Sequence, residues 1–274
     1  MTSRVAVVKG ERSVETVAKA LRLVGDLKYL SDKPVLIKVN FITTKTWDTG
    51  ATTDPVVVEA IIKTIQMWNE QLYVVESNAT STNADKAAQA TGMLEVCNKY
   101  NVTFLNLSKL DDKVTLNVQD PETLSKITVP RLVAEGYVVS AAKMKTHSET
   151  QVTLGLKNMF GVIPDRFKWK YHIKGIDKVI VDINTVVRPA LTVIDGFVAM
   201  EGSGPVSGSP IQTNLILAGR DPVSTDSTTS RIMGFDPAAI YHIRRASEKG
   251  LGEMNNIETV GERLETVTRQ FRRA

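Results

Sequence analysis

Short runs of β-branched apolar residues alternate with helix-like segments through the first half of the chain, and this alternation constrains the fold more than any other feature. Residues 4–9 and 34–39 are strand-like, and residues 13–23 between them have helical apolar spacing with Ser13 placed to cap the first turn. Asp54-Pro55 marks the next helix start. The sequence therefore predicts an α/β fold with largely parallel or mixed sheets and helices on both faces, in which ligands bind beyond the carboxyl ends of strands.

The later segments continue this pattern. Residues 136–142 (GYVVSAA) predict a buried strand, and residues 176–187 predict a helix that ends before Pro189. Asp221-Pro222 and Asp236-Pro237 each place a capping aspartate and a first-turn proline at a predicted helix start.

We expect a single domain over residues 1–274, because no linker divides the chain cleanly. A hinge near residues 142–150 would separate lobes 1–142 and 143–274, which would then face each other across a cleft. Such a cleft is a common place for a ligand.

The composition limits the classes of partner and cofactor. The single cysteine, Cys97, excludes a disulfide within the chain and a cysteine-ligated iron–sulfur cluster made by this chain alone. A net charge of +4 is too small to imply nucleic-acid binding by itself. No segment reaches the roughly 18 apolar residues of a membrane span, and no apolar signal core precedes the first strand. We expect a cytoplasmic protein with no membrane partner.

The densest group of polar side chains begins where the strand at residues 136–142 ends. Lys143, Lys145 and His147 alternate, so in an extended segment they would share one face and converge on an anionic small molecule as candidate catalytic residues. Lys157 and Asn158 follow at the start of a short turn, where a partly buried lysine would have a lowered pKa or form a covalent adduct. A basic, solvated surface is the alternative.

Two of the three histidines flank this lysine. His147 and His172 lie on either side of Lys157 in the sequence and could share acid–base work or hold a metal-containing cofactor. His242 follows the Asp236-Pro237 helix start, and we interpret it as a packing or surface residue.

Residues 166–172 (RFKWKYH) interleave cations with aromatic side chains. This pattern is typical of a surface that stacks bases and neutralises phosphates, but a strand with one aromatic face or a flap over an anionic ligand explains it equally. Nucleic acid is the disfavoured alternative because the run is short.

A glycine-rich loop at residues 201–210 follows a strand-like segment. Gly202 and Gly204 would let backbone amides approach an anion, although the loop lacks the lysine of a Walker sequence and a tight hairpin explains it too. Asp195 and Glu201, at the strand end and in the loop, are candidates for orienting a basic residue or a ligand hydroxyl.

Several segments together resemble the domain of unknown function 362 family, from the first strand to about residue 261. They include KMKTH (143–147), GLKNMFGVIP (155–164), VIDGFVAMEGSGPVSG (193–208), the Lys38-Val39-Asn40 strand end and the Asp54-Pro55 helix start. Many members carry a ferredoxin-like segment with two iron–sulfur clusters, which this chain lacks. The resemblance therefore implies a ferredoxin-like protein partner for any cluster, and it implies a domain type rather than a reaction.

A more distant resemblance is to the lactate racemase family, whose nickel-pincer nucleotide is tethered through a lysine. By its spacing this resemblance implies that His147 is an acid–base residue, Lys157 the tether and His172 the nickel ligand. The residues that we expect to bind a cofactor are Lys157, Asn158, Lys38, Asn40, Asp195, Glu201, Gly202 and Gly204. No histidine precedes His147, where that family has a second acid–base histidine, so a single-base reaction, a hydride-type reaction and loss of the cofactor all stay open.

Three functional hypotheses follow. The first is an enzyme, racemase-like, isomerase-like or redox, with a cleft lined by lysines and histidines. The second is a redox-accessory or cofactor-delivery module that docks an iron–sulfur protein through residues 166–174 and the tail residues Arg269, Arg272 and Arg273. The third is a nucleic-acid-binding protein, whose affinity would fall steeply with salt.

Overall fold

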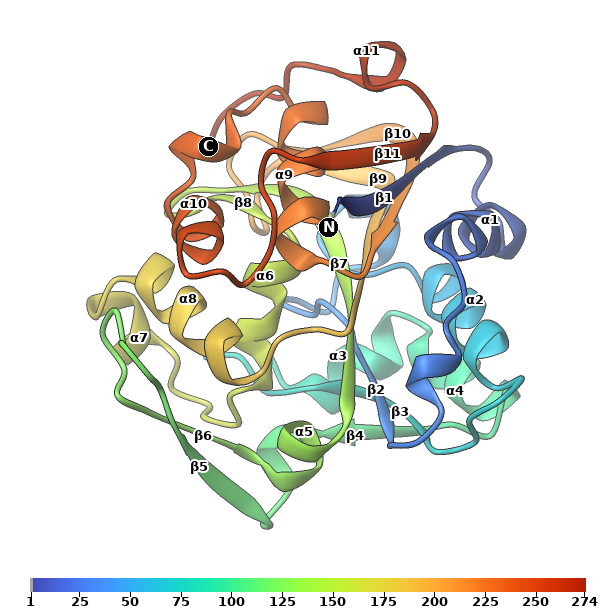
Figure 1. Ribbon diagram of the computed structural model, residues 1–274. Coiled ribbons are helices and arrows are strands. Elements are labelled where there is room, and N and C mark those ends of the chain that lie inside the picture. The colour runs from blue at the N-terminus through green and yellow to red at the C-terminus, as the bar shows by residue number, and fades with distance from the viewer. Residues whose placement is uncertain (1) are drawn as a thin grey trace.

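One mixed sheet of nine strands runs through the molecule (Figure 1). The computed structural model describes residues 2–274. Across the sheet the strands lie in the order β11 (Ile257–Gly261), β1 (Ser3–Lys9), β10 (Ser209–Gly219), β9 (Leu191–Glu201), β7 (Tyr137–His147), β2 (Val35–Lys38), β3 (Leu72–Glu76) and β4 (Thr103–Asn106), and β8 (Gln151–Thr153) pairs with the end of β7. Strands β9, β7, β2, β3 and β4 are mutually parallel, whereas β10 is antiparallel to both of its neighbours.

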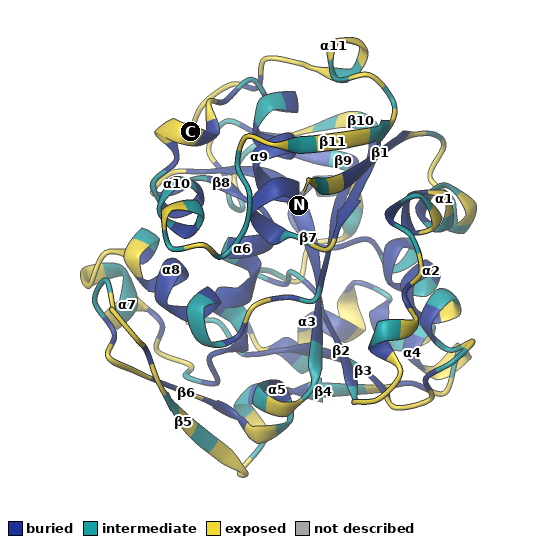
Figure 2. Cartoon of the chain, in the orientation of Figure 1, coloured by how far each residue is buried: buried dark blue, intermediate teal, exposed yellow. Residues whose placement is uncertain are grey.

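Helices cover both faces of this sheet, as the alternation of segments predicts. One face carries α1 (Val14–Val24), α2 (Pro55–Ile65), α3 (Ala84–Ala90) and α4 (Met93–Lys99). The other carries α5 (Arg131–Glu135), α6 (Gly155–Asn158), α7 (Trp169–Ile173), α8 (Ile176–Val186), α9 (Pro222–Ile232) and α10 (Tyr241–Glu248), with the short α11 (Leu264–Val267) near the C-terminus. Successive side chains of β2 show the two layers, because Leu36 packs in one hydrophobic cluster and Ile37 in the other. The buried strands between these layers are visible in Figure 2.

The predicted helix starts are confirmed where a side chain caps the first turn. Ser13 accepts a hydrogen bond from Thr16 N, Asp54 from Val56 N and Asp221 from Ser224 N. Asp236 also caps a turn, but the turn is a short 3-10 helix (Pro237–Ala239) and α10 begins only at Tyr241. The predicted helix at Asp236-Pro237 is therefore interrupted.

The boundary between lobes that the sequence suggested, at residues 142–143, lies within the main sheet. Residues 142 and 143 both lie inside β7, and the sheet unites strands from both sides of that point. A separate hairpin, β5 (Lys113–Asn117) with β6 (Lys126–Pro130), lies outside the main sheet. Within residues 2–274 no helix is long and apolar enough to cross a membrane, and the cytoplasmic location stays a prediction.

Candidate functional site

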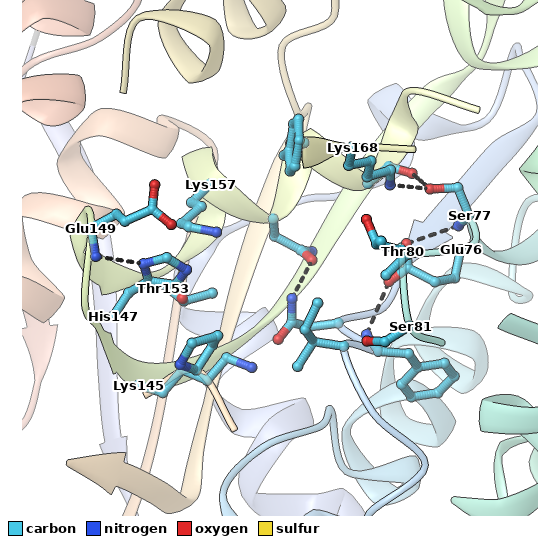
Figure 3. A pocket seen from close by; sticks show the side chains of 18 of the residues that line it. Glu76, Ser77, Thr80, Ser81, Lys145, His147, Glu149, Thr153, Lys157 and Lys168 are labelled. Atoms are coloured by element: carbon cyan, nitrogen blue, oxygen red, sulfur yellow. Dashed lines mark hydrogen bonds between the residues drawn. The ribbon is translucent and has the colours of Figure 1, made fainter. Parts of the chain in front are cut away.

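A cavity of about 250 Å³ opens beyond the carboxyl ends of β2, β3 and β7 (Figure 3). Parallel strands bring their ends to one edge of the sheet, and the loops that follow them form the walls. The ionisable side chains that line it are four lysines, two histidines and two glutamates: Lys38, Lys145, Lys157, Lys168, His147, His172, Glu76 and Glu149. The wall is therefore rich in cations.

One of the two glutamates forms an ion pair with a lysine. Lys38 Nζ lies 2.9 Å from a Glu76 carboxylate oxygen, and it also donates to Val39 O at 2.6 Å and to Asn158 Oδ1 at 3.2 Å. The same carboxylate accepts from the backbone amides of Phe41 and Ser77. Burial lowers the pKa of Lys38, and the Glu76 charge opposes that shift, so this ion pair is a fixed part of the wall.

Lys145 has no such partner. Its side chain is 1% exposed, and its Nζ donates to the backbone oxygen of Ala51 at 2.6 Å. Burial, followed by the nearby charges of Lys157 and Lys143, holds the pKa of this amine well below its ordinary value. A negative charge in the cavity would oppose that shift.

Lys157 lies on α6, and within residues 2–274 its amine forms no ion pair. Burial lowers its pKa to about 8. Lys168 on the opposite wall donates to Ser77 Oγ at 2.6 Å, and burial lowers its pKa to about 8 as well. Both amines are thus poised to change protonation near neutral pH.

A buried carboxylate from a distant helix fixes the turn that carries Lys157. Asp226 on α9 accepts hydrogen bonds from the backbone amides of Gly155 and Leu156, each at 2.8 Å. A methyl group on Gly155 would lie 2.4 Å from Thr192 Cγ2, so only glycine lets α6 approach the sheet this closely. Burial raises the pKa of Asp226 to about 7.

His147 ends β7 with an imidazole whose tautomer is determined by the backbone. Its Nδ1 accepts hydrogen bonds from the amides of Glu149 at 3.1 Å and Thr150 at 3.4 Å, so a neutral ring carries its proton on Nε2. Burial, followed by the Lys157 charge, lowers the pKa of His147 to about 2. The ring is therefore a neutral hydrogen-bond donor and not a base for proton transfer near pH 7.

We expect the His147 imidazole to stay neutral, with its proton on Nε2, throughout pH 5–9. Long-range ¹H–¹⁵N NMR of histidine-labelled protein would show this directly. Because the folded pKa lies below the unfolded value, His147 should also cause the free energy of unfolding to decrease as the pH falls below about 6.5. A His147 ring that titrates near its ordinary pKa would contradict this assignment.

His172 lines the same cavity from α7, and its ring orientation is fixed by a carboxylate. Its Nδ1 lies 2.9 Å from Glu149 Oε1, and its ring meets the Phe160 ring edge to face at 5.9 Å between centroids. Glu149, which the sequence did not single out, therefore positions both histidines, one through its backbone amide and one through its carboxylate.

Some predicted site residues lie elsewhere. Lys143 is fully buried beneath the cavity and lies 2.8 Å from Asp195 Oδ2, and neither residue lines the cavity. Glu201 instead binds Arg272 of the C-terminal tail at 2.8 Å. His242 is buried against Asp177, consistent with its interpretation as a packing residue.

The glycine-rich loop packs against the end of β7. Gly202 O accepts from Thr146 Oγ1 at 2.7 Å, and Gly204 O accepts from Ser148 N at 3.3 Å. A methyl group on Gly204 would lie 2.0 Å from Thr146 O. The two glycines thus allow a close backbone approach, and of this loop only Pro205 reaches the cavity.

The structure also adds polar groups that sequence reasoning missed. Glu76 ends the strand next to β2, a position that the strand-end rule could have identified. Thr153 and the predicted Asn40 both line the cavity, and each has a buried side-chain oxygen without a hydrogen-bond partner among the described residues. Exchanging the oxygen and nitrogen of the Asn40 amide would not help, because Asn40 Nδ2 donates to Asn158 Oδ1 and the exchange would bring two oxygens together. Such oxygens are normally satisfied by water or a ligand.

The chain is similar to known proteins over most of its length. The sequence model of a family described as "Domain of unknown function (DUF362)" matches residues 35–231. A curated relative, "Thylakoid-associated protein sll1697" of Synechocystis sp. (strain ATCC 27184 / PCC 6803 / Kazusa), is 24% identical over 246 residues, which are 87% of this chain and 74% of the relative. The matched range includes every lysine and histidine that lines the cavity.

Proposed function

Since the chain belongs to the family described as "Domain of unknown function (DUF362)", we propose its function from the residues of its own cavity. It is an enzyme that binds an anionic small molecule there and moves a proton on it, with the Lys157 amine as the base. The observation that carries this proposal is the surplus of lysines around one cavity, combined with the lowered pKa values of Lys157 and Lys168.

The charge distribution favours an anion. Lys38 is neutralised by Glu76, whereas Lys145 and Lys168 donate only to uncharged oxygen atoms and Lys157 has no ion-pair partner. Desolvated ammonium groups without counterions are costly, and a carboxylate or phosphate bound between them would remove that cost. The unsatisfied oxygens of Asn40 and Thr153 favour a ligand that also carries a hydroxyl or amino group.

Two groups divide the proton chemistry. In the free protein an amine with a pKa of about 8 is neutral in roughly a tenth of the molecules at pH 7, and the neutral form can accept a proton from carbon or oxygen. His147 would donate a hydrogen bond from Nε2 to the oxygen on which charge develops. In this arrangement the lysine is the base and the neutral imidazole is the stabilising donor.

Hydrogen exchange tests the proposal without a known substrate. Small hydroxy- and oxo-carboxylates, with phosphorylated analogues, would be incubated with the protein in D₂O, and deuterium incorporation next to the functional carbon would be followed by ¹H NMR. The proposal predicts exchange for one class of anion at a rate proportional to protein concentration. The absence of both exchange and binding across the panel would contradict it.

Anion binding should be coupled to proton uptake. Because the ammonium form holds the anion, the affinity should fall by up to about tenfold per pH unit for each participating amine, from its free pKa of about 8 up to its higher pKa in the complex. Calorimetry in buffers of different ionisation enthalpy should show uptake of protons on binding near pH 8 and almost none near pH 6. An affinity that is flat from pH 7 to 9.5 would exclude these amines as the anion site.

A second candidate function keeps Lys157 as the tether of a nickel-pincer-like nucleotide, and one observation favours it. Glu149 binds Nδ1 of His172 and so leaves Nε2 as a potential metal ligand, the carboxylate–histidine arrangement of many metal sites. Among residues 2–274 no cluster of three ligating side chains accompanies it, so the cofactor would have to supply its own donors. Bound there, it would supply metal-centred redox chemistry.

Intact-mass spectrometry with metal analysis on protein purified anaerobically from its native host tests this candidate. An adduct on Lys157, lost in a Lys157→Met variant, would support it. An unmodified chain without metal would exclude it and leave the proton-transfer proposal standing.

A further inference from the structure

Exposed apolar side chains are concentrated in one short segment. Four large hydrophobic residues are exposed in residues 2–274, and three of them, Phe167, Trp169 and Ile173, lie within seven positions at 62%, 56% and 76% exposure. Trp169 and Ile173 are four residues apart on α7 and so share a helix face. Figure 2 shows this helix at an edge of the molecule. Such a group of exposed apolar side chains marks an interaction surface.

The segment is anchored on its other side. Lys168 is buried and donates to Ser77, while Tyr171 packs edge to face on Phe160 and donates to Asp165 at 2.6 Å. The alternation in residues 166–173 therefore separates a face that helps to form the cavity wall from a face that points to solvent. A fixed backbone holds the apolar side chains outward.

The free charges beside these side chains are all positive. Arg166, Lys174 and Lys178 are exposed and form no ion pair within the described residues. Lys170 is paired with Asp165 at 2.5 Å, and the nearby Asp177 is paired with His242. The partner of this surface must therefore be apolar and negatively charged at once.

We propose that this surface, formed by Arg166, Phe167, Trp169, Ile173, Lys174 and Lys178, docks the protein on an anionic phospholipid bilayer. Tryptophan and phenylalanine insert at the boundary between headgroups and acyl chains, while lysine and arginine bind the phosphates. The sequence predicted no membrane partner because no segment could span a bilayer, but surface docking needs no span. Docking would place the wall of the cavity to which Lys168 and His172 contribute close to the lipid.

Other partners match these features less well. A second copy of the chain in a two-fold dimer would bring like charges together. Single-stranded nucleic acid needs successive stacking platforms along a basic groove, whereas α7 is a single short helix. An acidic protein that used both this surface and the C-terminal tail matches less well for two reasons. Arg272 of the tail is already paired with Glu201, and Figure 1 shows the C-terminus apart from α7.

Flotation of the full chain with phosphatidylcholine vesicles, with and without phosphatidylglycerol, tests the proposal. We expect retention only on the anionic vesicles, weakened by salt, with a blue shift of tryptophan fluorescence that the Phe167→Ser/Trp169→Ser variant lacks. The double variant Phe167→Ser/Trp169→Ser and the single variant Lys174→Glu should each lower the partition coefficient onto the anionic vesicles about tenfold or more. Matched controls exist in Met67→Ser, which removes the fourth exposed apolar residue, and Lys19→Glu, which reverses an exposed charge on α1.

Three results would overturn the inference. The first is a lack of retention on anionic vesicles, and the second is retention that both patch variants leave unchanged. The third is a wild-type dimer that the Phe167→Ser/Trp169→Ser variant converts to a monomer, because the surface would then be a contact between copies.

Discussion

Replacing Lys157 by methionine is expected to lower the rate of proton exchange on the bound anion by a factor of about 100 to 10,000, the range of a general base. Anion affinity should fall by about 10- to 100-fold, because one charge-assisted hydrogen bond is lost. The free energy of unfolding should change by less than about 1 kcal/mol, because within residues 2–274 the amine has no ion-pair partner to leave behind. Exchange followed by NMR, calorimetry and urea denaturation measure the three quantities.

Two further variants separate the roles of Lys157. Lys157→Arg keeps the positive charge but cannot lose its proton, so it should retain most of the anion affinity and lose the exchange activity. Lys63→Met, at an exposed position on α2, is the matched control and should change neither. An exchange rate in Lys157→Met equal to that of the wild type would show that another group is the base.

Replacing Lys143 by methionine is expected to affect stability strongly, in contrast to Lys157→Met, and to lower the free energy of unfolding by about 3–5 kcal/mol. Lys143 and Asp195 are both fully buried and 2.8 Å apart, so the variant leaves an uncompensated carboxylate in the core. Burial already raises the pKa of Asp195, and losing the Lys143 charge should raise it further. The folded protein then retains a proton that the unfolded chain releases, so the destabilisation should be smaller at pH 5 than at pH 8.

A double-mutant cycle identifies the cause. Asp195→Asn keeps an oxygen that can accept from the amide of Asp54, so the Lys143→Met/Asp195→Asn protein should be more stable than the Lys143→Met protein. Additive losses in urea denaturation would show that the two side chains are not coupled and that Lys143 contributes only through packing.

Local signals made much of the fold predictable. Ser13, Asp54 and Asp221 cap helices because their side chains bond amides two or three residues away, and such contacts are visible in the sequence. The parallel core followed from the alternation of strands and helices. The pairing of β10 with β1 could not be predicted, since it joins residues some 200 positions apart.

The candidate site was predictable as a region but not in its details. Alternation along one strand suggested that Lys143, Lys145 and His147 share a ligand, and β7 does extend to His147. The pairing of β7 with β9 shifts register between Lys143 and Lys145, and Asp195 of β9 meets Lys143 beneath the cavity. Only Lys145 and His147 of these three line the cavity, because Lys143 forms an ion pair with Asp195, 52 positions away in the sequence.

The chemistry of His147 depended on contacts that residue types do not reveal. A histidine between lysines suggested a residue that gains and loses protons, but the turn after β7 directs two backbone amides at its Nδ1. Burial keeps the ring neutral, and the geometry of that turn places its proton on Nε2, which is why we propose Lys157 rather than His147 as the base. Asp226, which holds the Lys157 turn from α9, was similarly hidden by sequence distance.

A site-resolved titration of the Lys157 amine by NMR tests its assignment as the base, and the Lys157→Met spectrum identifies its signal. The free protein should give a pKa near 8, and saturation with an anion that exchanges deuterium should raise it by about one unit or more, because the bound charge favours the ammonium form. A Lys157 pKa near its ordinary value of about 10.4 that no anion alters would contradict the assignment of this amine as the base of an anion-binding site.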